Sequence, residues 1–265
     1  MRIIDFHVHY SEDPKLTLRG QPIRMGREAI LEMMDRAGVD GAVMLAVAPR
    51  RGAKAARRLN DQLAGACEGN ARLHGFGSVH PDDRAHALRE MTRCVRTLGL
   101  HGFKLHPSSQ RFDCASPHLL YVLRHAASLG VPVLIDSYAP FDDAQPGKLL
   151  RAASASPDTK LCLAHAGLHR FERFAAFGFL REDGRLPNVY FDLSATCVMF
   201  LGSPFQEQFR WVTERLGRDR LLFGSDFPTH SQEEALAAIR GFGYPSAWLP
   251  ELLGGNAASL LAVAA

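Results

Sequence analysis

Eight short apolar segments, rich in β-branched residues, alternate along this chain with longer segments of helical character. The predicted strands are 2–9, 39–47, 73–80, 101–106, 131–136, 160–165, 188–194 and 220–226. From the second onward they recur about every thirty residues, which is the length of a strand, a helix and two short loops. Near-continuous apolar strands of this kind are typical of parallel sheets that helices cover.

Two of the intervening segments carry clear helix boundaries. The segment that begins at Arg27 stops at Gly38, a residue that commonly ends helices in a left-handed conformation. The segment at 116–130 opens with Ser116 and Pro117, which suit a helix N-terminus, and stops at Gly130. These signals support a repeated alternation of strand and helix.

This alternation predicts an α/β fold, a closed (β/α)₈ TIM barrel. The alternative is a doubly wound open sheet, which normally carries a glycine-rich phosphate-binding turn after its first strand. Here residues 7–15 read HVHYSEDPK and contain no glycine. We find no linker or low-complexity stretch, so we expect one barrel domain over residues 1–265.

Charge and cysteine content exclude several classes of function. The net charge of +3, from 31 basic and 28 acidic residues, is too balanced to indicate binding to nucleic acid or an anionic membrane. The five cysteines are scattered, form no CxxC pair and predict reduced thiols. No apolar run approaches the ~20 residues of a membrane span, and polar residues stand where a signal peptide would be apolar. We therefore expect a cytoplasmic protein that acts on a small molecule. The aromatic stretch at 169–180 fits either a homo-oligomer contact or a helix packed on the barrel.

Several predicted strands end in a residue able to bind a metal or transfer a proton: His7, His9, His80, Lys104, His106, Asp136, His165 and Asp226. Each has a structural explanation when taken alone, such as a hydrogen-bonded histidine or an aspartate that caps the next helix. In a barrel, however, these strand ends converge on one small volume. Buried polar groups there would cost several kcal/mol without partners or an ion. Imidazoles beside carboxylates predict one divalent ion, zinc first and manganese as the alternative.

Six motifs give the chain a resemblance to a known family. They are DFHVH (5–9), GFKLHP (102–107), LAHAG (163–167), YFDLS (190–194), LLFGSDFP (221–228) and LGGNAASLL (253–261). The chain resembles the amidohydrolase 2 branch of the amidohydrolase superfamily, whose members include hydrolases, decarboxylases and lactonases. The resemblance implies that His7, His9 and Asp226 bind a metal, and that His165 lies beside the reacting water or the substrate.

Asp136 departs from the family pattern, because members with a firmly bound metal usually end the fifth strand in histidine. Asp136 either ligates the ion, which we favour, or holds the substrate or His165 while the ion is weakly bound or absent. Lys104 matches a lysine that some superfamily members carboxylate to bridge two metals. We favour its acting as a cation that binds a substrate carboxylate; an ion pair with Asp136 or Asp226 is the structural alternative.

These residues predict a hydrolase that acts on a small, carboxylate-bearing lactone, ester or amide. In this prediction the ion is held by His7, His9, Asp136 and Asp226. Asp226 takes the proton of the activated water, and His165 orients that water or polarises the carbonyl. Four further residues are predicted to bind substrate: Lys104, His106, His80 and Arg24, the last from a lid at 10–26 that also contains Arg19. A decarboxylase with the same centre, a metal-independent lactonase and a degenerate, non-catalytic barrel are the alternatives.

Overall fold

The computed structural model describes residues 1–47 and 52–262. Eight parallel strands form one sheet in the order β1-β4-β5-β6-β7-β8-β9-β10. Their bounds are β1 Ile4–His9, β4 Gly41–Leu45, β5 Leu73–Gly77, β6 Gly102–Leu105, β7 Val133–Asp136, β8 Leu161–Ala164, β9 Val189–Asp192 and β10 Leu221–Leu222. The predicted TIM barrel and its eight strands are confirmed, each strand shorter than the segment that predicted it.

The barrel closes between its first strand and the segment that follows the last one. Phe6 N donates to Phe223 O at 2.8 Å, and Asp226 N donates to His7 O at 2.9 Å. Although β10 has only two residues, the chain beyond it therefore continues along β1. This closure places residues near the two ends of the sequence side by side.

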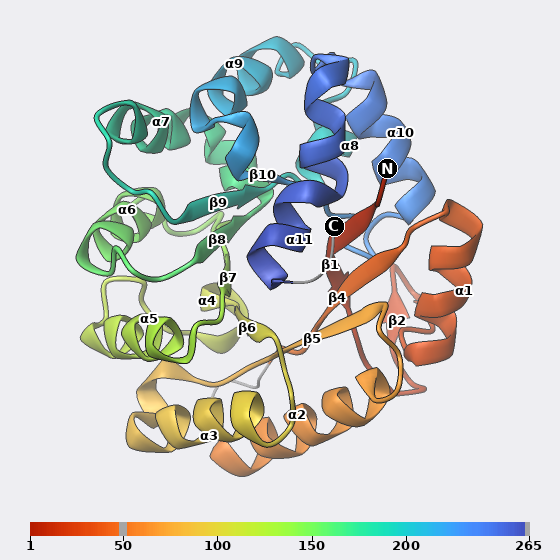
Figure 1. Ribbon diagram of the computed structural model, residues 1–265, viewed down its shortest axis with the longest axis vertical. Coiled ribbons are helices and arrows are strands. Elements are labelled where there is room, and N and C mark those ends of the chain that lie inside the picture. The colour runs from red at the N-terminus through yellow and green to blue at the C-terminus, as the bar shows by residue number, and fades with distance from the viewer. Residues whose placement is uncertain (48–51, 263–265) are drawn as a thin grey trace.

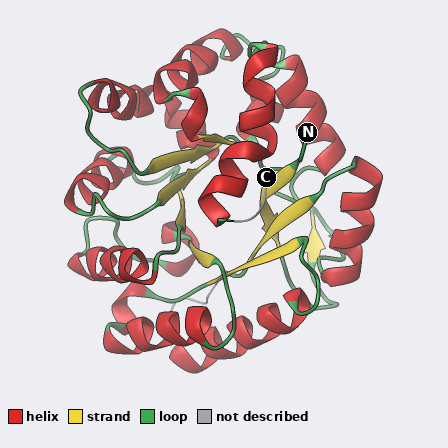
Figure 2. Cartoon of the chain, in the orientation of Figure 1, coloured by secondary structure: helices red, strands yellow, loops and turns green. Residues whose placement is uncertain are grey.

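Helices surround the strands, most of them as an outer ring (Figure 1, Figure 2). Their bounds are α1 Arg27–Ala37, α2 Ala53–Cys67, α3 Ala85–Arg96, α4 Pro107–Gln110, α5 Pro117–Leu129, α6 Gln145–Ala155, α7 Ala175–Glu182, α8 Thr196–Phe200, α9 Gln206–Leu216, α10 Gln232–Gly241 and α11 Asn256–Leu261. Gly38 and Gly130 end α1 and α5 in left-handed conformations, with φ of 66° and 77°. The predicted boundaries of these two helices are thus confirmed. Among the described residues, no helix is long and apolar enough to cross a membrane.

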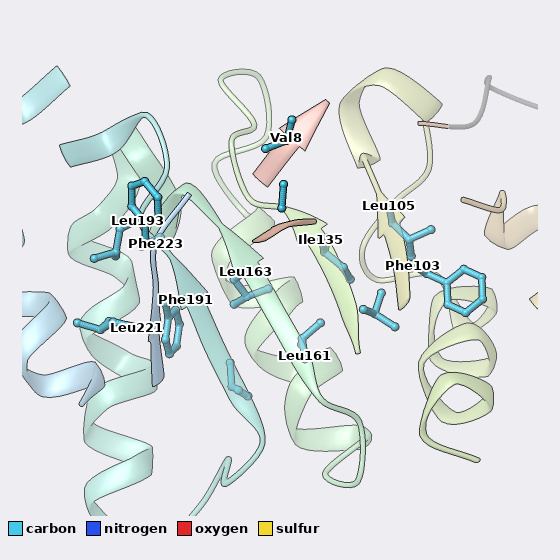
Figure 3. Packing of buried hydrophobic residues seen from close by; sticks show 14 of the residues in the cluster. Val8, Phe103, Leu105, Ile135, Leu161, Leu163, Phe191, Leu193, Leu221 and Phe223 are labelled. Carbon is cyan, nitrogen blue, oxygen red and sulfur yellow. The ribbon is translucent and has the colours of Figure 1, made fainter. Parts of the chain in front are cut away.

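The apolar core has two layers. Alternate strand residues such as Phe103, Leu163 and Phe191 pack outward against the helices (Figure 3). The remaining strand residues point into the barrel, where Phe6 and Phe76 pack with the apolar face of α11. Figure 1 shows α11 lying across one end of the strand ring. Since this end is sealed by apolar packing, the polar strand ends lie at the other.

The segment at 10–26, predicted to be a lid, contains a small β-hairpin. It consists of β2 (Thr17–Leu18) and β3 (Gln21–Pro22), which pair antiparallel. At the base of the segment, Ser11 N donates to Met25 O at 3.1 Å. The hairpin is thereby anchored immediately after β1, next to the barrel mouth.

Candidate active site

Three side chains from the two sides of the barrel closure converge on one point. His7 and His9 lie at the end of β1, and Asp226 lies beside them just after β10. His7 Nε2 lies 3.3 Å from both His9 Nε2 and Asp226 Oδ1, and His9 Nε2 lies 3.2 Å from Asp226 Oδ1. Atoms at these separations match the corners of a tetrahedron around an ion with bonds of about 2.0–2.2 Å. The three atoms therefore fit one divalent ion.

The hydrogen bond that His7 makes through Nδ1 leaves Nε2 unprotonated, so Nε2 can bind that ion. Its Nδ1 lies 2.5 Å from Oδ2 of Asp192, which ends β9 and is fully buried. A carboxylate here accepts the Nδ1 proton, so the Nε2 lone pair faces His9 and Asp226. Burial, and then the charge of Lys104, hold the pKa of His7 well below its ordinary value. His7 is thus kept in the neutral form that binds metals.

The backbone around these residues is strained or crowded. Asp226 and His165 adopt left-handed conformations, with φ of 63° and 62°, which non-glycine residues rarely occupy. Such strain persists only where the surrounding structure enforces it, and it is concentrated at functional sites. Gly224 allows the close approach, because a Cβ there would lie 2.6 Å from Asp192 Oδ1 and 2.9 Å from His7 Cβ.

His165 and Asp136 form a buried pair beside the three convergent residues. His165 Nε2 lies 3.2 Å from Asp136 Oδ2, and its Nδ1 lies 3.1 Å from the carbonyl oxygen of Ser194. Both partners are acceptors, so both ring nitrogens donate and His165 is an imidazolium. Burial alone would lower the pKa of His165, but the hydrogen bond to Asp136 and the nearby carboxylates raise it to about 9. The same pairing outweighs burial at Asp136 and lowers the pKa of that carboxyl.

Asp136, predicted as a fourth ligand, lies against basic side chains. Besides His165, its Oδ2 lies 3.7 Å from His106 Nε2 and 4.0 Å from Lys104 Nζ. It does not join the group of His7, His9 and Asp226 whose ligand atoms are within mutual reach. Its ligation of the ion stays a prediction.

Lys104 is fully buried behind the site. Its Nζ lies 3.2 Å from His7 Nε2, and it faces Asp136 at the longer distance given above. Burial lowers the pKa of Lys104, although Asp136, Asp226 and Asp192 oppose this. The contacts are those of the structural alternative, an ion pair; substrate binding and carboxylation of Lys104 stay untested.

A cavity of about 490 Å³ opens above these residues. Its lining is His9, Arg19, His106, Asp136, Tyr138, His165, Leu168, Ala195, Met199, Asp226, Thr229 and His230. Three larger cavities, of about 850, 820 and 570 Å³, contain none of the convergent metal-binding candidates. Because the smallest of these four cavities alone is lined by the convergent residues, we take it as the substrate site.

Two predicted substrate-binding residues lie elsewhere. His80 is buried, with its Nε2 2.9 Å from Gln110 O and its Nδ1 accepting from Asp82 N at 3.1 Å. Both of its ring nitrogens are therefore occupied by backbone groups. Arg24 lines the separate cavity of about 820 Å³, whereas Arg19 of the same segment lines the candidate substrate site.

Asp192 and Ser194 hold the site together and were not singled out in the sequence. Ser194 Oγ donates to Asp192 Oδ2 at 2.9 Å and lies 3.1 and 3.0 Å from the Nδ1 atoms of His7 and His165. The available signal was their position at the end of the predicted strand 188–194, where residues two apart face the same way. Asp5 lies two residues before His7 in β1, where its carboxylate accepts from Ser225 N at 2.9 Å and Gln232 Nε2 at 2.8 Å.

Comparison with known proteins adds a family and a set of similar folds. A family model described as Amidohydrolase matches residues 4–263. The 5-carboxyvanillate decarboxylase from Sphingomonas paucimobilis is 20% identical, with a TM-score of 0.73 and 99% of both chains covered. A dihydroxybenzoic acid decarboxylase from Polaromonas, solved with manganese and 2-nitroresorcinol, is 18% identical, with a TM-score of 0.73 over 98% of this chain and 97% of that one.

A third similar structure has a different described activity. It is a probable 2-pyrone-4,6-dicarboxylic acid hydrolase from Acinetobacter baumannii with citric acid bound. It is 18% identical, with a TM-score of 0.69, and the match covers 99% of this chain and 100% of that one. No curated protein sequence matches this chain closely enough to count as a relative. Similar barrels thus carry more than one type of reaction.

Proposed function

Because this chain belongs to the amidohydrolase family, we propose that it is a metal-dependent hydrolase of a small, carboxylate-bearing lactone, ester or amide. One observation carries the proposal. The metal-binding candidates His9 and Asp226 and the paired His165 and Asp136 line the same cavity of about 490 Å³. That volume suits a small molecule.

The residues that would hold the ion are His7, His9 and Asp226. Two imidazoles and a carboxylate suit zinc and also accept manganese, the ion named for the similar Polaromonas decarboxylase. When bound, such an ion polarises a carbonyl oxygen and lowers the pKa of water toward neutrality.

The chain's own residues then supply the proton transfers. Asp226, with an oxygen at the cavity wall, accepts the proton of the attacking water. His165 donates the proton on Nε2 to the leaving oxygen or nitrogen. Asp136, 3.2 Å from that nitrogen, keeps His165 protonated until the leaving group replaces Asp136 as the acceptor of this proton.

Decarboxylation is the second candidate, and the imidazolium of His165 at the cavity wall favours it. In that reaction the bond between the ring carbon and the carboxylate breaks, carbon dioxide leaves, and His165 donates its proton to the carbon. The similar folds of two decarboxylases are consistent with the same barrel supporting this chemistry. The two reactions use the same proton donor but release different products.

The deciding experiment measures metal content and products together. Protein purified without chelator is analysed for zinc and manganese, then assayed on lactones, esters, amides and hydroxybenzoates. We expect bound metal and acid release without carbon dioxide. Carbon dioxide release from hydroxybenzoates would identify a decarboxylase, and lactone hydrolysis by metal-free protein would identify a metal-independent lactonase. Absence of both metal and turnover would contradict an enzymatic role.

A further inference from the structure

Arg19 places a guanidinium at the candidate substrate site without a protein partner. It lines the same cavity as His9 and Asp226. Within residues 1–47 and 52–262, no hydrogen bond or ion pair involves its side chain. Several exposed arginines in the described part of the chain, such as Arg89 and Arg96, likewise have no such partner, so it is the position of Arg19 at the cavity that distinguishes it. A guanidinium carries five donors, so the unpaired group at this cavity is available to a ligand.

The turn that carries Arg19 does not explain why the residue is arginine. Arg19 and Gly20 form the two-residue connection of the β2–β3 hairpin, and both have positive φ, 51° and 79°. Turns of this kind favour asparagine followed by glycine, because a side chain such as arginine is strained there. The strain costs on the order of 1 kcal/mol. An asparagine would make the same turn at lower cost, so the guanidinium itself is the feature that needs an explanation.

The acidic groups of the cavity already have partners. Asp226 lies 3.2 Å from His9 Nε2, and Asp136 lies 3.2 Å from His165 Nε2. Arg19 therefore adds a positive charge that the described cavity does not neutralise. An anionic group of the substrate would neutralise this charge.

We propose that Arg19 is a specificity-determining residue that binds a carboxylate of the substrate away from the group that reacts. This inference rests on the proposed function, which places the reacting group at His9 and Asp226. The planar fork of arginine matches the two oxygens of a carboxylate. The hairpin fixes the position of the Arg19 backbone beside the cavity, so the site selects small acids that carry a second polar group at the metal end.

The test compares binding of two probes, isophthalate and benzoate, to the manganese-loaded full chain by titration calorimetry. Isophthalate can place one carboxylate at the metal end and the other at Arg19, whereas benzoate has one carboxylate only. We expect the wild type to bind isophthalate about tenfold more tightly, since hydrogen bonds to charged groups contribute about that much. Arg19→Met should bring the ratio of the two dissociation constants close to one and leave benzoate affinity unchanged within about twofold, as expected when only the second carboxylate loses its partner.

Two further variants serve as controls. Arg19→Asn also removes the guanidinium, but asparagine tolerates the left-handed turn. A lost preference in this variant is therefore not due to a distorted hairpin. Arg24→Met is the matched control, because Arg24 belongs to the same segment but lines the other cavity. It should retain the preference for isophthalate. Circular dichroism confirms folding of each variant.

Three results would overturn the role of Arg19: no preference in the wild type, a preference that survives both Arg19 variants, or an equal loss in Arg24→Met. Turnover of the wild type is measured separately. Metal-dependent turnover without the isophthalate preference would reject the role of Arg19 alone. A preference that depends on Arg19, without any turnover, would reject the proposed function alone.

Discussion

At the scale of single residues, two histidines of the candidate site differ in what their ring nitrogens contact, and the proposed function gives each nitrogen its own role. His7 uses Nδ1 to reach Asp192 and keeps Nε2 for an ion, whereas His165 uses both nitrogens as donors. In the proposed mechanism the same side chain is thus a neutral metal ligand in one place and an acid in the other. The difference arises from the acceptors that neighbouring strands bring to each ring.

Removing His9 tests the metal site directly. We expect His9→Ala to lose metal, because it deletes one of three ligands, and this costs more than the ~10–100-fold in affinity typical of changes to a ligand's outer partners. His106→Ala is the control, since His106 lines the same cavity outside the trio and its loss should leave metal content unchanged. Metal content is measured by mass spectrometry. Equal metal content in His9→Ala and wild type would contradict the assignment.

Asp136→Asn separates two roles of the aspartate. If Asp136 holds His165 in its protonated form, the amide weakens that interaction and kcat falls on the order of 100-fold, as for general acids. We expect metal content to stay at the wild-type level, with a smaller change in KM than in kcat. Loss of metal from this variant would instead support the fourth ligand predicted from the sequence.

At the scale of elements, strand ends were predictable and loops were not. His7, His9 and Asp226 could be found because strand residues alternate and the ends of barrel strands meet at one mouth. The sequence did not show which of Arg19 and Arg24 lies at the candidate substrate site. The two residues line different cavities because of the β2–β3 hairpin, which depends on a turn at positions 19 and 20. The contacts of His80 could not be predicted for a related reason, since one of its backbone partners is Gln110, which ends α4 thirty residues further along the chain.

Gly224 allows β1, β9 and the segment after β10 to pack closely against one another. A methyl group there would collide with Asp192 and His7, so Gly224→Ala should lower the free energy of unfolding by about 1–3 kcal/mol. It should also weaken metal binding, because the collision displaces His7. Gly241→Ala in α10 is the matched control: its Cβ would meet Leu201 at an ordinary 3.6 Å, and we expect no loss of stability. Urea denaturation measures both, and equal stability of the two variants would contradict the packing argument.

At the scale of the whole molecule, the barrel has one polar and one apolar end. The polar end carries the candidate active site, and α11 covers the other (Figure 1). The composition of the strands allowed this fold to be predicted, because apolar residues fill both strand faces except near the carboxyl ends. His74, the second residue of β5, is an exception: it is buried far along the strand from those ends, with 3% of its surface exposed.

His74 should make the stability of the barrel sensitive to acid. Both of its ring nitrogens lack a hydrogen-bond partner in the described part of the chain. Burial first, and then the charges of His101 and Arg2, lower its pKa from 6.5 to about 4. Above pH 6.5 the ring is neutral in both the folded and the unfolded chain. As the pH falls toward 4, the unfolded chain binds a proton that the folded chain resists, so stability falls with pH.

The size of the effect follows from the shift. The lowering of the pKa of His74 from 6.5 to about 4 corresponds to about 3 kcal/mol of stability lost between pH 6.5 and pH 4. His74→Leu should remove this loss while keeping stability at pH 7, because leucine fills an apolar place and has no unpaired polar atom. His86→Gln is the control, since His86 is exposed on α3 and its replacement should leave the acid response of the wild type. The free energy of unfolding of the three proteins is measured by urea denaturation at pH 7, 5 and 4. An equal loss of stability in the wild type and His74→Leu would show that protonation of other groups causes the loss.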